Sequence, residues 1–481
     1  MRNKLVDSRR YTVDGEEILA AARPCLPSTV YRIPRLTYGG LFVVLAALWL
    51  GAGGHSKGTP AGRREVVFWH LWGGKDRPVV EEIVARFNAS QDEHFVRAVA
   101  MPGSNLDLKF FLGVAGGDPP DLLNQDDPIV ADWAHRGALV PLDELARSEE
   151  YSRLGGWLFP AAREIGSYDG RLYALCNGLD IRALYYDQSV LDEFGREPPR
   201  SLEELDELAM LIAPPDAKGP RRRFGFLPDP RRLWAWGIVF GGRFHDPATG
   251  QVTADSEPIV RALDWMASYT RRYGADEVAA FRTGDQGLTG ASFPLLEGRY
   301  AMIMDGQWRV AEMEAARRAA KSAGRSPPRY GVVPLPPPSG GRSRAGWVNG
   351  NFFIVPKGAK NRAGAWAFMK FWSGFGGNEA EAARVSAAGG WIPASPAVVE
   401  QPAFQDYLKR NPAFGVFVDL AASPHQVPYP AVPGAAFFER EINRATEEAM
   451  YGGVPARDAL AVAAGRVRQK LAENAAEEGG P

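Results

Sequence analysis

The chain has 481 residues, of which 45% are hydrophobic and 23% are charged. This balance is typical of a soluble globular protein, and the length is enough for two or three domains. The formal net charge of −1 gives no strong field for attracting nucleic acid or an anionic membrane surface. Two cysteines, Cys25 and Cys176, are too few for a disulfide framework or a four-ligand zinc site.

An uncharged segment lies near the N-terminus at residues 36–54, and its strongly apolar part is 41–50. As a helix the uncharged run would be roughly 28 Å long, slightly short of a bilayer core of about 30 Å. Arg32 and Arg35 precede it, which is the charge pattern of a secretory segment. We therefore expect the body of the chain, from about residue 60, to lie outside the cytoplasm.

The sequence leaves the fate of residues 36–54 open. No cysteine follows the apolar run, which argues against an ordinary lipoprotein signal, and the bulky Leu50 makes a poor cleavage site. These features favour an uncleaved signal anchor, a transmembrane helix, over a cleaved signal peptide, with a buried helix as the third alternative. Residues 1–35 are then a cytoplasmic tail or reflect a misplaced translation start, and residues 55–64 form a linker. Cys25 is not expected to pair with Cys176.

Strands and helices alternate from residue 65 onwards. Residues 65–72 are continuous in apolar and β-forming residues and predict a buried strand. Pro78 then begins a helix whose apolar residues share one face. A strand at 95–100, a helix at 107–115 and a third strand follow. This order predicts parallel strands with crossover helices in an α/β lobe.

The rest of the body continues the pattern. Residues 170–175 and 182–187 predict two strands joined by an extended segment at 177–180. Ser201 is the expected N-cap of a helix that runs to Ile212. Further predicted elements are an amphipathic helix at 257–273, a strand within 298–306, a short strand at 330–333 that leads into a polyproline connector, a strand at 352–356, a helix at 362–372 and helical structure after about residue 440.

Residues 116–121, Gly-Gly-Asp-Pro-Pro-Asp, must end a helix, turn and begin a strand. Together with their flanks at 108–112 and 130–143, they resemble the solute-binding proteins of bacterial ABC importers, in the family 1 or sugar-type branch. Other matching motifs occur in the same order between about residues 65 and 465, namely 168–175, 240–242, 298–308, 355–358 and 390–393.

The resemblance implies an α/β fold of the two-lobed, type II periplasmic-binding-protein kind, with lobes joined by crossing hinge segments near 177–182 and 334–350. It implies a first lobe of residues 65–178 plus 300–347, a second lobe of 179–299 plus 348–470, and a polar tail at 471–481. A carbohydrate or polyol would be captured between the lobes, and the closed form would be recognised by membrane permease subunits and their ATPases. We expect a monomer without a cofactor.

Catalytic and metal signatures are missing from the sequence. It contains no Gly-x-Ser-x-Gly elbow, phosphate loop or His-Glu-x-x-His motif, and the six histidines lack metal-ligand spacing. The adjacent acids Asp126 and Asp127 would point to opposite faces of a strand and make a poor glycosidase pair. The same argument disfavours an iron site at Tyr185 and Tyr186. No catalytic or metal-binding residue is predicted; a membrane-tethered solute sensor and a secreted carbohydrate-active enzyme remain as alternatives.

The candidate ligand-binding residues are aromatic and polar residues at strand ends and turns. Trp and Tyr rings pack on the apolar faces of pyranoses, and Asp, Asn and Arg bind hydroxyl groups. For each residue, ordinary packing is the alternative role, and of Trp234 and Trp236 one is expected in the cleft and the other in the core. The predicted set, placed by the resemblance, is Trp72, Gly73, Gly74, Asp126, Asp180, Arg182, Trp234, Trp236, Gly241, Asp305, Trp308, Trp347, Asn349, Gly350, Asn351 and Trp391. The identity of the solute is left open.

Overall fold

The computed structural model describes residues 59–74, 76–101, 106–126, 128–217, 223–285 and 288–478. The predicted tail at 1–35 and the predicted signal segment at 36–54 lie outside these ranges, as do Cys25 and Asp127. Within the described ranges, no helix combines the length and the apolar character that crossing a membrane requires. Cys176 is buried.

The first α/β segment follows the predicted order. It comprises β1 (Arg64–His70), α2 (Arg77–Ser90), β2 (His94–Ala100), α3 (Leu106–Ala115) and β3 (Leu122–Asp126). Strand β1 pairs in parallel with both β2 and β3, so the predicted parallel strands with crossover helices are confirmed. Helix α2 buries one apolar face, formed by Val80, Ile83, Val84 and Phe87.

The Gly-Asp-Pro-Pro-Asp turn is fixed by its last carboxylate. Asp121 is buried, and its oxygens accept hydrogen bonds from the backbone N–H groups of Val67, Lys360 and Asn361 at 2.9, 2.8 and 2.7 Å. Gly117 takes a positive φ of 72°, which glycine adopts without a steric penalty. The motif therefore ties β3 to β1 and to a segment about 240 residues later, which explains why the turn needs an acid at its end.

Strand β6 (Ala174–Asp187) corrects one prediction. We expected two strands separated by an extended connection at 177–180, but β6 is continuous through these residues. The connection is a strand because Gly178, Leu179 and Asp180 pair with Asn351, Gly350 and Asn349 of β11 (Gly346–Ile354). A partner more than 160 residues away supplies the hydrogen bonds that local sequence could not reveal.

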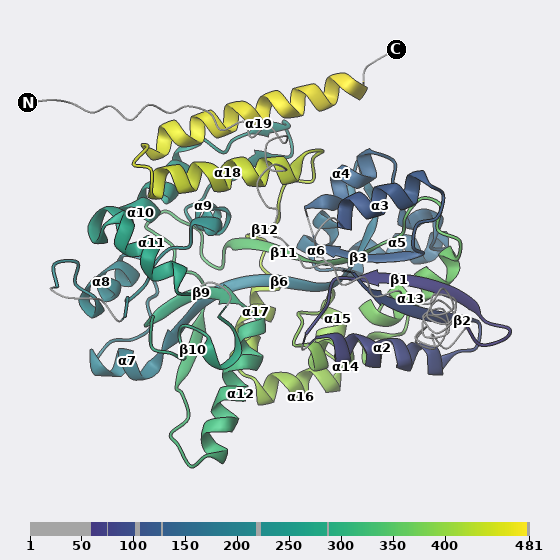
Figure 1. The fold of residues 1–481 in the computed structure, drawn as a ribbon, viewed down its shortest axis with the longest axis horizontal. Helices are drawn as coiled ribbons and strands as arrows, with labels where there is room; N and C mark the ends of the chain where they lie inside the picture. The colour runs from purple at the N-terminus through teal and green to yellow at the C-terminus, as the bar shows by residue number, and fades with distance from the viewer. Residues whose placement is uncertain are drawn as a thin grey trace, which may run out of the picture. The chain divides into compact units, whose positions relative to one another are not determined.

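The larger sheet has the strand order β10-β6-β11-β3-β1-β2, with β9 (Met302–Gly306) joined to β6 and β12 (Gln426–Val427) joined to β11. Strands β6 and β11 run antiparallel across the middle of the molecule, and Figure 1 shows them between the region of β1 and β2 and the region of β9 and β10. These two strands are the crossing segments of the fold.

The elements between β3 and β9 are mostly helical. In chain order they are α4 (Ile129–His135), η1 (Leu142–Glu144), α5 (Ser148–Trp157), α6 (Pro160–Ile165), β4 (Ser167–Tyr168), β5 (Arg171–Leu172), β6, α7 (Gln188–Glu193), α8 (Leu202–Ile212), η2 (Pro230–Arg232), α9 (Leu233–Val239), β7 (His245–Asp246), β8 (Gln251–Val252), α10 (Glu257–Tyr273), α11 (Ala275–Thr283) and η3 (Gly290–Ser292). Helix α8 begins as predicted, because the Ser201 hydroxyl accepts from the Glu204 N–H at 3.2 Å.

The elements after β9 include two further strands of the larger sheet, β10 and β11, the short β12, and helices. They are α12 (Trp308–Ser322), β10 (Tyr330–Val333), β11, α13 (Arg362–Ser373), α14 (Glu379–Gly389), α15 (Pro396–Val399), α16 (Pro402–Arg410), α17 (Phe414–Ala421), β12, α18 (Ala435–Met450) and α19 (Ala456–Glu478). Helix α19 thus continues into the segment predicted as a polar tail.

Two segments bear on the predicted division of the chain between lobes. Residues 300–347 were predicted in the first lobe and 348–470 in the second. Strand β9 instead pairs with residues 182–186 of β6, and α13 packs against β1, β2 and α2.

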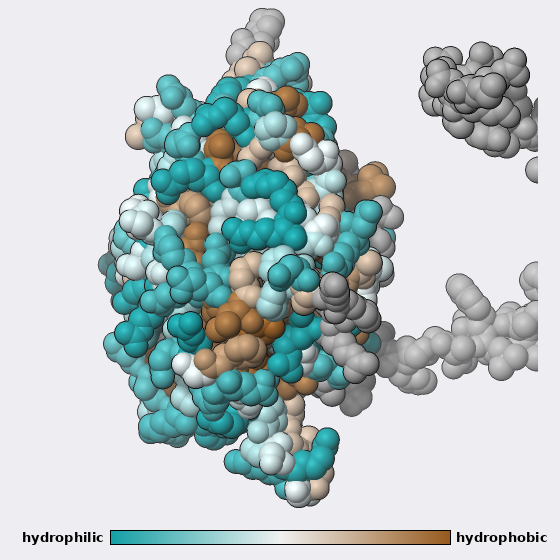
Figure 2. All heavy atoms as spheres, turned by 90° about the vertical axis from the view of Figure 1, so that its left-hand side faces the viewer, coloured by the Kyte–Doolittle hydropathy of each residue, from teal (hydrophilic) through white to brown (hydrophobic). Residues whose placement is uncertain are grey.

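Polar side chains cover most of the face that Figure 2 shows. Among the described residues, the large apolar side chains with substantial exposure are Leu108, Leu112, Leu211 and Val462. Helix α3 therefore carries two of these four, one turn apart.

Candidate functional site

Arg182 is the centre of a polar cluster where β6 crosses the molecule. Its side chain is buried and donates from Nη1 to Asn349 Oδ1 and to the backbone oxygen of Asp180, the latter at 3.2 Å. The guanidinium lies 4.3 Å from the Trp347 ring centre and 5.0 Å from that of Trp308. Desolvation, followed by the charge of Arg232, lowers the Arg182 pKa to about 10. At neutral pH Arg182 is a fixed cation held between two indoles.

Asp180 is held on the other side by Gln307. The Gln307 Nε2 donates to Asp180 Oδ1 at 2.6 Å and to the Leu179 oxygen at 3.2 Å, while Gln307 Oε1 accepts from the Ile181 N–H at 3.1 Å. Desolvation raises the Asp180 pKa, and Arg182 and Gln307 oppose that shift. Gln307 therefore fixes the orientation of Asp180 as well as the backbone of β6.

Asp126 joins the cluster at the end of β3. Asn351 of β11 pairs with Asp126 on one side and with Gly178 of β6 on the other. Desolvation by the surrounding protein and the charge of Asp180 raise the Asp126 pKa to about 7, against a smaller opposing effect of Arg182. Residue Asp126 is exposed, and its carboxylate makes no hydrogen bond to another described residue. It is the acid of the cluster that is left to bind something else.

Strand β11 brings the predicted polar residues together because of a glycine. A Cβ on Gly350 would lie 2.6 Å from the Gly178 oxygen, closer than packed atoms allow. The glycine lets β11 approach β6 at this point, so that Asn349 pairs with Asp180. Asn349 and Asn351 remain partly accessible, whereas Trp347 is only 4% exposed. Trp347 is therefore a packing partner of Arg182 rather than an open stacking surface.

Three tryptophan rings pack together beside this cluster. The Trp72 ring is stacked on Trp372 at 5.2 Å, and Trp391 is stacked on the same ring at 5.7 Å. Trp372 is buried, while Trp72 and Trp391 are half-buried. Trp391 lies against Gly178, two residues before Asp180, since a Cβ on Gly178 would be 3.4 Å from the Trp391 Cβ. Trp72 and Trp391 thus form an aromatic surface next to the polar cluster.

Three other predicted residues, Gly73, Gly74 and Asp305, lie after β1 or in β9. Gly73 and Gly74, after β1, are exposed, and neither would bring an added Cβ within 4 Å of another atom. Asp305 is in β9 and forms an ion pair with Arg309 at 2.8 Å, just before Trp308 begins α12.

Helix α9 places its two tryptophans inside the protein. Trp234 and Trp236 are 1% and 0% exposed, and Trp234 is in the lining of a cavity described below. Gly241, just after α9, has a φ of 96° and lies near the Gly340 oxygen.

Several residues of the cluster were not predicted from the sequence. Gln307 stands between two predicted residues, and that adjacency was an available signal. Arg232, whose guanidinium lies 5.5 Å from the Trp347 ring centre, and Trp372 carried no local signal because long-range packing places them. Among the described residues, no group of three or more His, Cys, Asp or Glu side chains could hold a metal ion.

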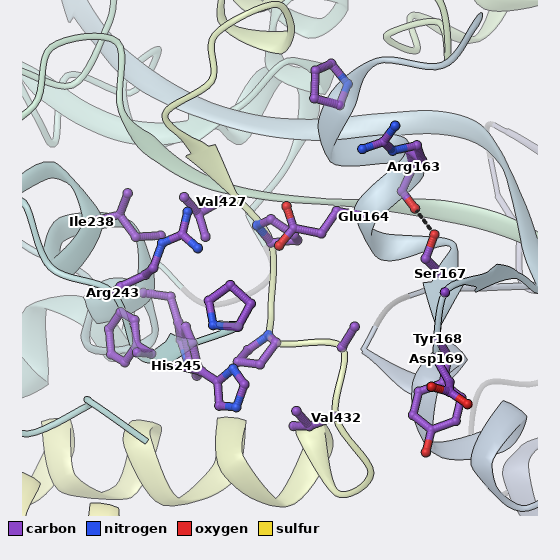
Figure 3. A pocket seen from close by; sticks show the side chains of 18 residues that line it. Arg163, Glu164, Ser167, Tyr168, Asp169, Ile238, Arg243, His245, Val427 and Val432 are labelled. Carbon is purple, nitrogen blue, oxygen red and sulfur yellow. Dashed lines mark hydrogen bonds between the residues drawn. The ribbon is translucent and has the colours of Figure 1, made fainter. Parts of the chain in front are cut away.

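A separate cavity of about 630 Å³ lies beside α6 and α9. Figure 3 shows Glu164 and Arg243 extending toward one another from opposite walls of it. The Tyr429 ring packs on residues of both regions, with its centre 4.7 Å from that of Trp234 in the cavity lining and 5.0 Å from that of Trp347 in the polar cluster. The two regions are therefore separate but share one aromatic layer.

Solved structures share the fold described above. The structure titled "CpMnBP1 with Mannotriose Bound" is 24% identical, with a TM-score of 0.69, over 83% of this chain and 99% of that chain. The sugar-binding protein MalE from Xanthomonas citri is 20% identical, with a TM-score of 0.71, over 87% of this chain and 100% of that one. The GacH receptor of Streptomyces glaucescens, solved unliganded and with acarbose, is 23% identical, with a TM-score of 0.65, over 85% and 98%. The predicted two-lobed solute-binding fold is confirmed.

A family model matches residues 82–413, which is more than half of the chain. The chain belongs to the bacterial extracellular solute-binding proteins. The resemblance noted from the sequence is thereby confirmed, and the body of the protein works outside the cytoplasm, as this family does.

Proposed function

We propose that this protein captures a carbohydrate between its two lobes and delivers it to the membrane subunits of an ABC importer. The observation that carries the proposal is the convergence of Asp126, Asp180, Arg182 and Asn349 where strands β3, β6 and β11 meet. Carboxylate and amide oxygens accept from sugar hydroxyls, and amide and guanidinium N–H groups donate to them.

The neighbouring indoles support the same ligand class. Trp72 and Trp391 offer half-buried aromatic rings fixed from behind by Trp372, and such rings pack on the C–H faces of pyranoses. The similar structures are described as bound to mannotriose, mannobiose, acarbose or maltotetraose, which is consistent with a saccharide here. In this proposal Trp234, Trp236 and Trp347 pack in the core, and the other predicted residues contact or frame the ligand.

The strand pairings support a division between lobes. We assign residues 59–178 and about 351–395 to the first lobe, and residues 179–350 to the second, because β9 pairs with the second half of β6 and α13 packs on β1 and β2. Strands β6 and β11 then pass through the hinge. Binding of ligand by both lobes would favour the closed state.

The protein acts in this proposal without chemical conversion of the ligand, as a monomer, and without a cofactor. Its partners are the permease subunits. The proposal includes anchoring of the protein to the membrane by residues 36–54, which lie outside the described ranges.

A thermal-shift screen of the full chain against mannobiose, mannotriose, maltotetraose, acarbose, cycloalternan and tagatose tests the proposal. A saccharide at about 100 times its dissociation constant should stabilise the protein by roughly 2.7 kcal/mol. Asp180→Ala should abolish the shift, while Asp264→Ala, an exposed acid on α10, should not. Mass spectrometry should recover the saccharide intact. Shifts that survive Asp180→Ala would contradict the proposed site.

A further inference from the structure

The cavity beside α6 and α9 has walls from three separate segments of the chain. Residues 160–170 form one wall, residues 234–247 another, and residues 427–432 the third. The volume of about 630 Å³ is within the range of roughly 300–1,000 Å³ that is usual for small-molecule sites. This cavity was not predicted from the sequence, apart from Trp234.

Charges of both signs face the cavity without being paired to each other. Glu164 and Arg163 come from α6, and Arg243 comes from the segment after α9 (Figure 3). None of their charged groups forms an ion pair or a side-chain hydrogen bond with another residue in the described ranges. Desolvation raises the Glu164 pKa, while the charge of Arg243 and then that of Arg163 lower it. A guest could therefore meet acceptor and donor groups together.

Part of the cavity lining is apolar. Phe244 packs on Trp234 with ring centres 4.0 Å apart, and both rings are buried. Proline rings complete the apolar lining at Pro160, Pro247, Pro428 and Pro430. Proline and aromatic rings lose little conformational entropy when a ligand is bound.

The charge balance indicates an uncharged, polyhydroxy guest. The cavity is lined by two arginines, Arg163 and Arg243, and two acids, Glu164 and Asp169, so it favours neither net charge. Desolvation lowers the His245 pKa, which leaves that ring neutral near pH 7. A hydroxyl can donate to a carboxylate and accept from a guanidinium, while sugar C–H groups pack on proline and aromatic carbon.

We propose that this cavity is a second saccharide-binding site, distinct from the polar cluster at β3, β6 and β11, with Glu164 and Arg243 binding hydroxyls from opposite walls. The Tyr429 ring links the two sites, because it packs on Trp347 of the polar cluster and on Trp234 of the cavity lining. The second site does not depend on the first being correct.

Isothermal titration of the full chain with mannotriose, and in parallel with maltotetraose, tests this inference. The wild type should bind two molecules of at least one saccharide per chain. The double variant Glu164→Gln with Arg243→Gln should lose one site, with its affinity reduced at least tenfold, and Ala431→Trp, which fills the cavity from an exposed position, should do the same. Glu149→Gln with Arg153→Gln, on the exposed face of α5, is the matched control and should keep both sites.

The outcomes separate the two sites. A single site that is lost in Asp180→Ala and kept in the Glu164/Arg243 variant would overturn the second site and leave the proposed function intact. A single site with the reverse behaviour would support the cavity and overturn the polar cluster as the ligand site. Two sites that both survive the Glu164/Arg243 variant and Ala431→Trp would overturn the inference, and so would the absence of heat with both saccharides.

Discussion

Arg182 is held by Asn349, by a backbone oxygen and by two indole rings, whereas Glu164 and Arg243 face a cavity of about 630 Å³ with no ion pair to a described residue. The first arrangement fixes the strands at the crossing, since each group limits the positions of the others. The second leaves donor and acceptor capacity unused by the protein. Charges in the polar cluster therefore hold the strands together as well as offering hydrogen-bonding groups, and only the Asp126 carboxylate makes no hydrogen bond to another described residue, while charges in the cavity are available to a ligand.

Replacing Arg182 should have the largest effect on stability, and it tests whether the Arg182 contacts hold the crossing strands together. Arg182→Met should destabilise the protein by about 3 kcal/mol, because it leaves Asp180 without its cationic neighbour in a desolvated place. Urea unfolding followed by tryptophan fluorescence measures the change. Arg153→Met, at an exposed position on α5, should stay within about 0.5 kcal/mol. Equal unfolding midpoints for the Arg182 variant and the wild type would break the comparison.

The close approach of β6 and β11 gives the next effect. Gly350→Ala should cost about 2 kcal/mol, because its Cβ would lie 2.6 Å from the Gly178 oxygen and the strands would have to separate. Gly73→Ala is the matched control, with open space around the added carbon, and should be close to neutral. Thermal unfolding of both variants measures the difference. A Gly350→Ala protein as stable as the control would show that β6 and β11 have room for a side chain at this position.

Asp126 sharpens the comparison through pH. The fold raises the Asp126 pKa from 3.8 to about 7. The stability linked to the protonated carboxyl group is therefore fully present below the pKa of the unfolded chain, 3.8, and is lost as the pH rises through about 7. Asn cannot ionise, so Asp126→Asn should gain stability over the wild type between about pH 4 and pH 8. The gain should be on the order of 1 kcal/mol, because the exposed side chain stays partly hydrated. Unfolding series in urea at several pH values test this, and a constant difference across the range would contradict it.

The cavity should give the smallest effect on stability. Glu164→Gln with Arg243→Gln should change the unfolding free energy by less than about 0.5 kcal/mol, because the two side chains are exposed and form no ion pair with a described residue. Circular dichroism during heating measures it. A loss of more than about 1 kcal/mol would mean that these charges support the fold, and would remove the contrast with Arg182.

Local sequence predicted the helices well. Helix α10 spans Glu257–Tyr273 as the periodicity indicated, with Ile259, Leu263, Met266 and Tyr269 buried. Helices form from contacts three and four residues apart, so their pattern is present in a short window. The candidate site was predicted as a set of residues near strand ends. Which tryptophans are buried and which are half-buried could not be predicted, because it depends on which distant surface covers each ring.

The sequence by itself determined the alternation of strands and helices, the turn that ends in Asp121, and the solute-binding family. Tertiary structure decided that β6 is one continuous strand, because β11 supplies its hydrogen bonds from a distant part of the chain. It also decided that Arg182 lies between Trp308 and Trp347, and that Glu164 faces Arg243 across a cavity. These contacts join residues tens to hundreds of positions apart, and packing sets their geometry. Local propensity and periodicity carry no information about such packing.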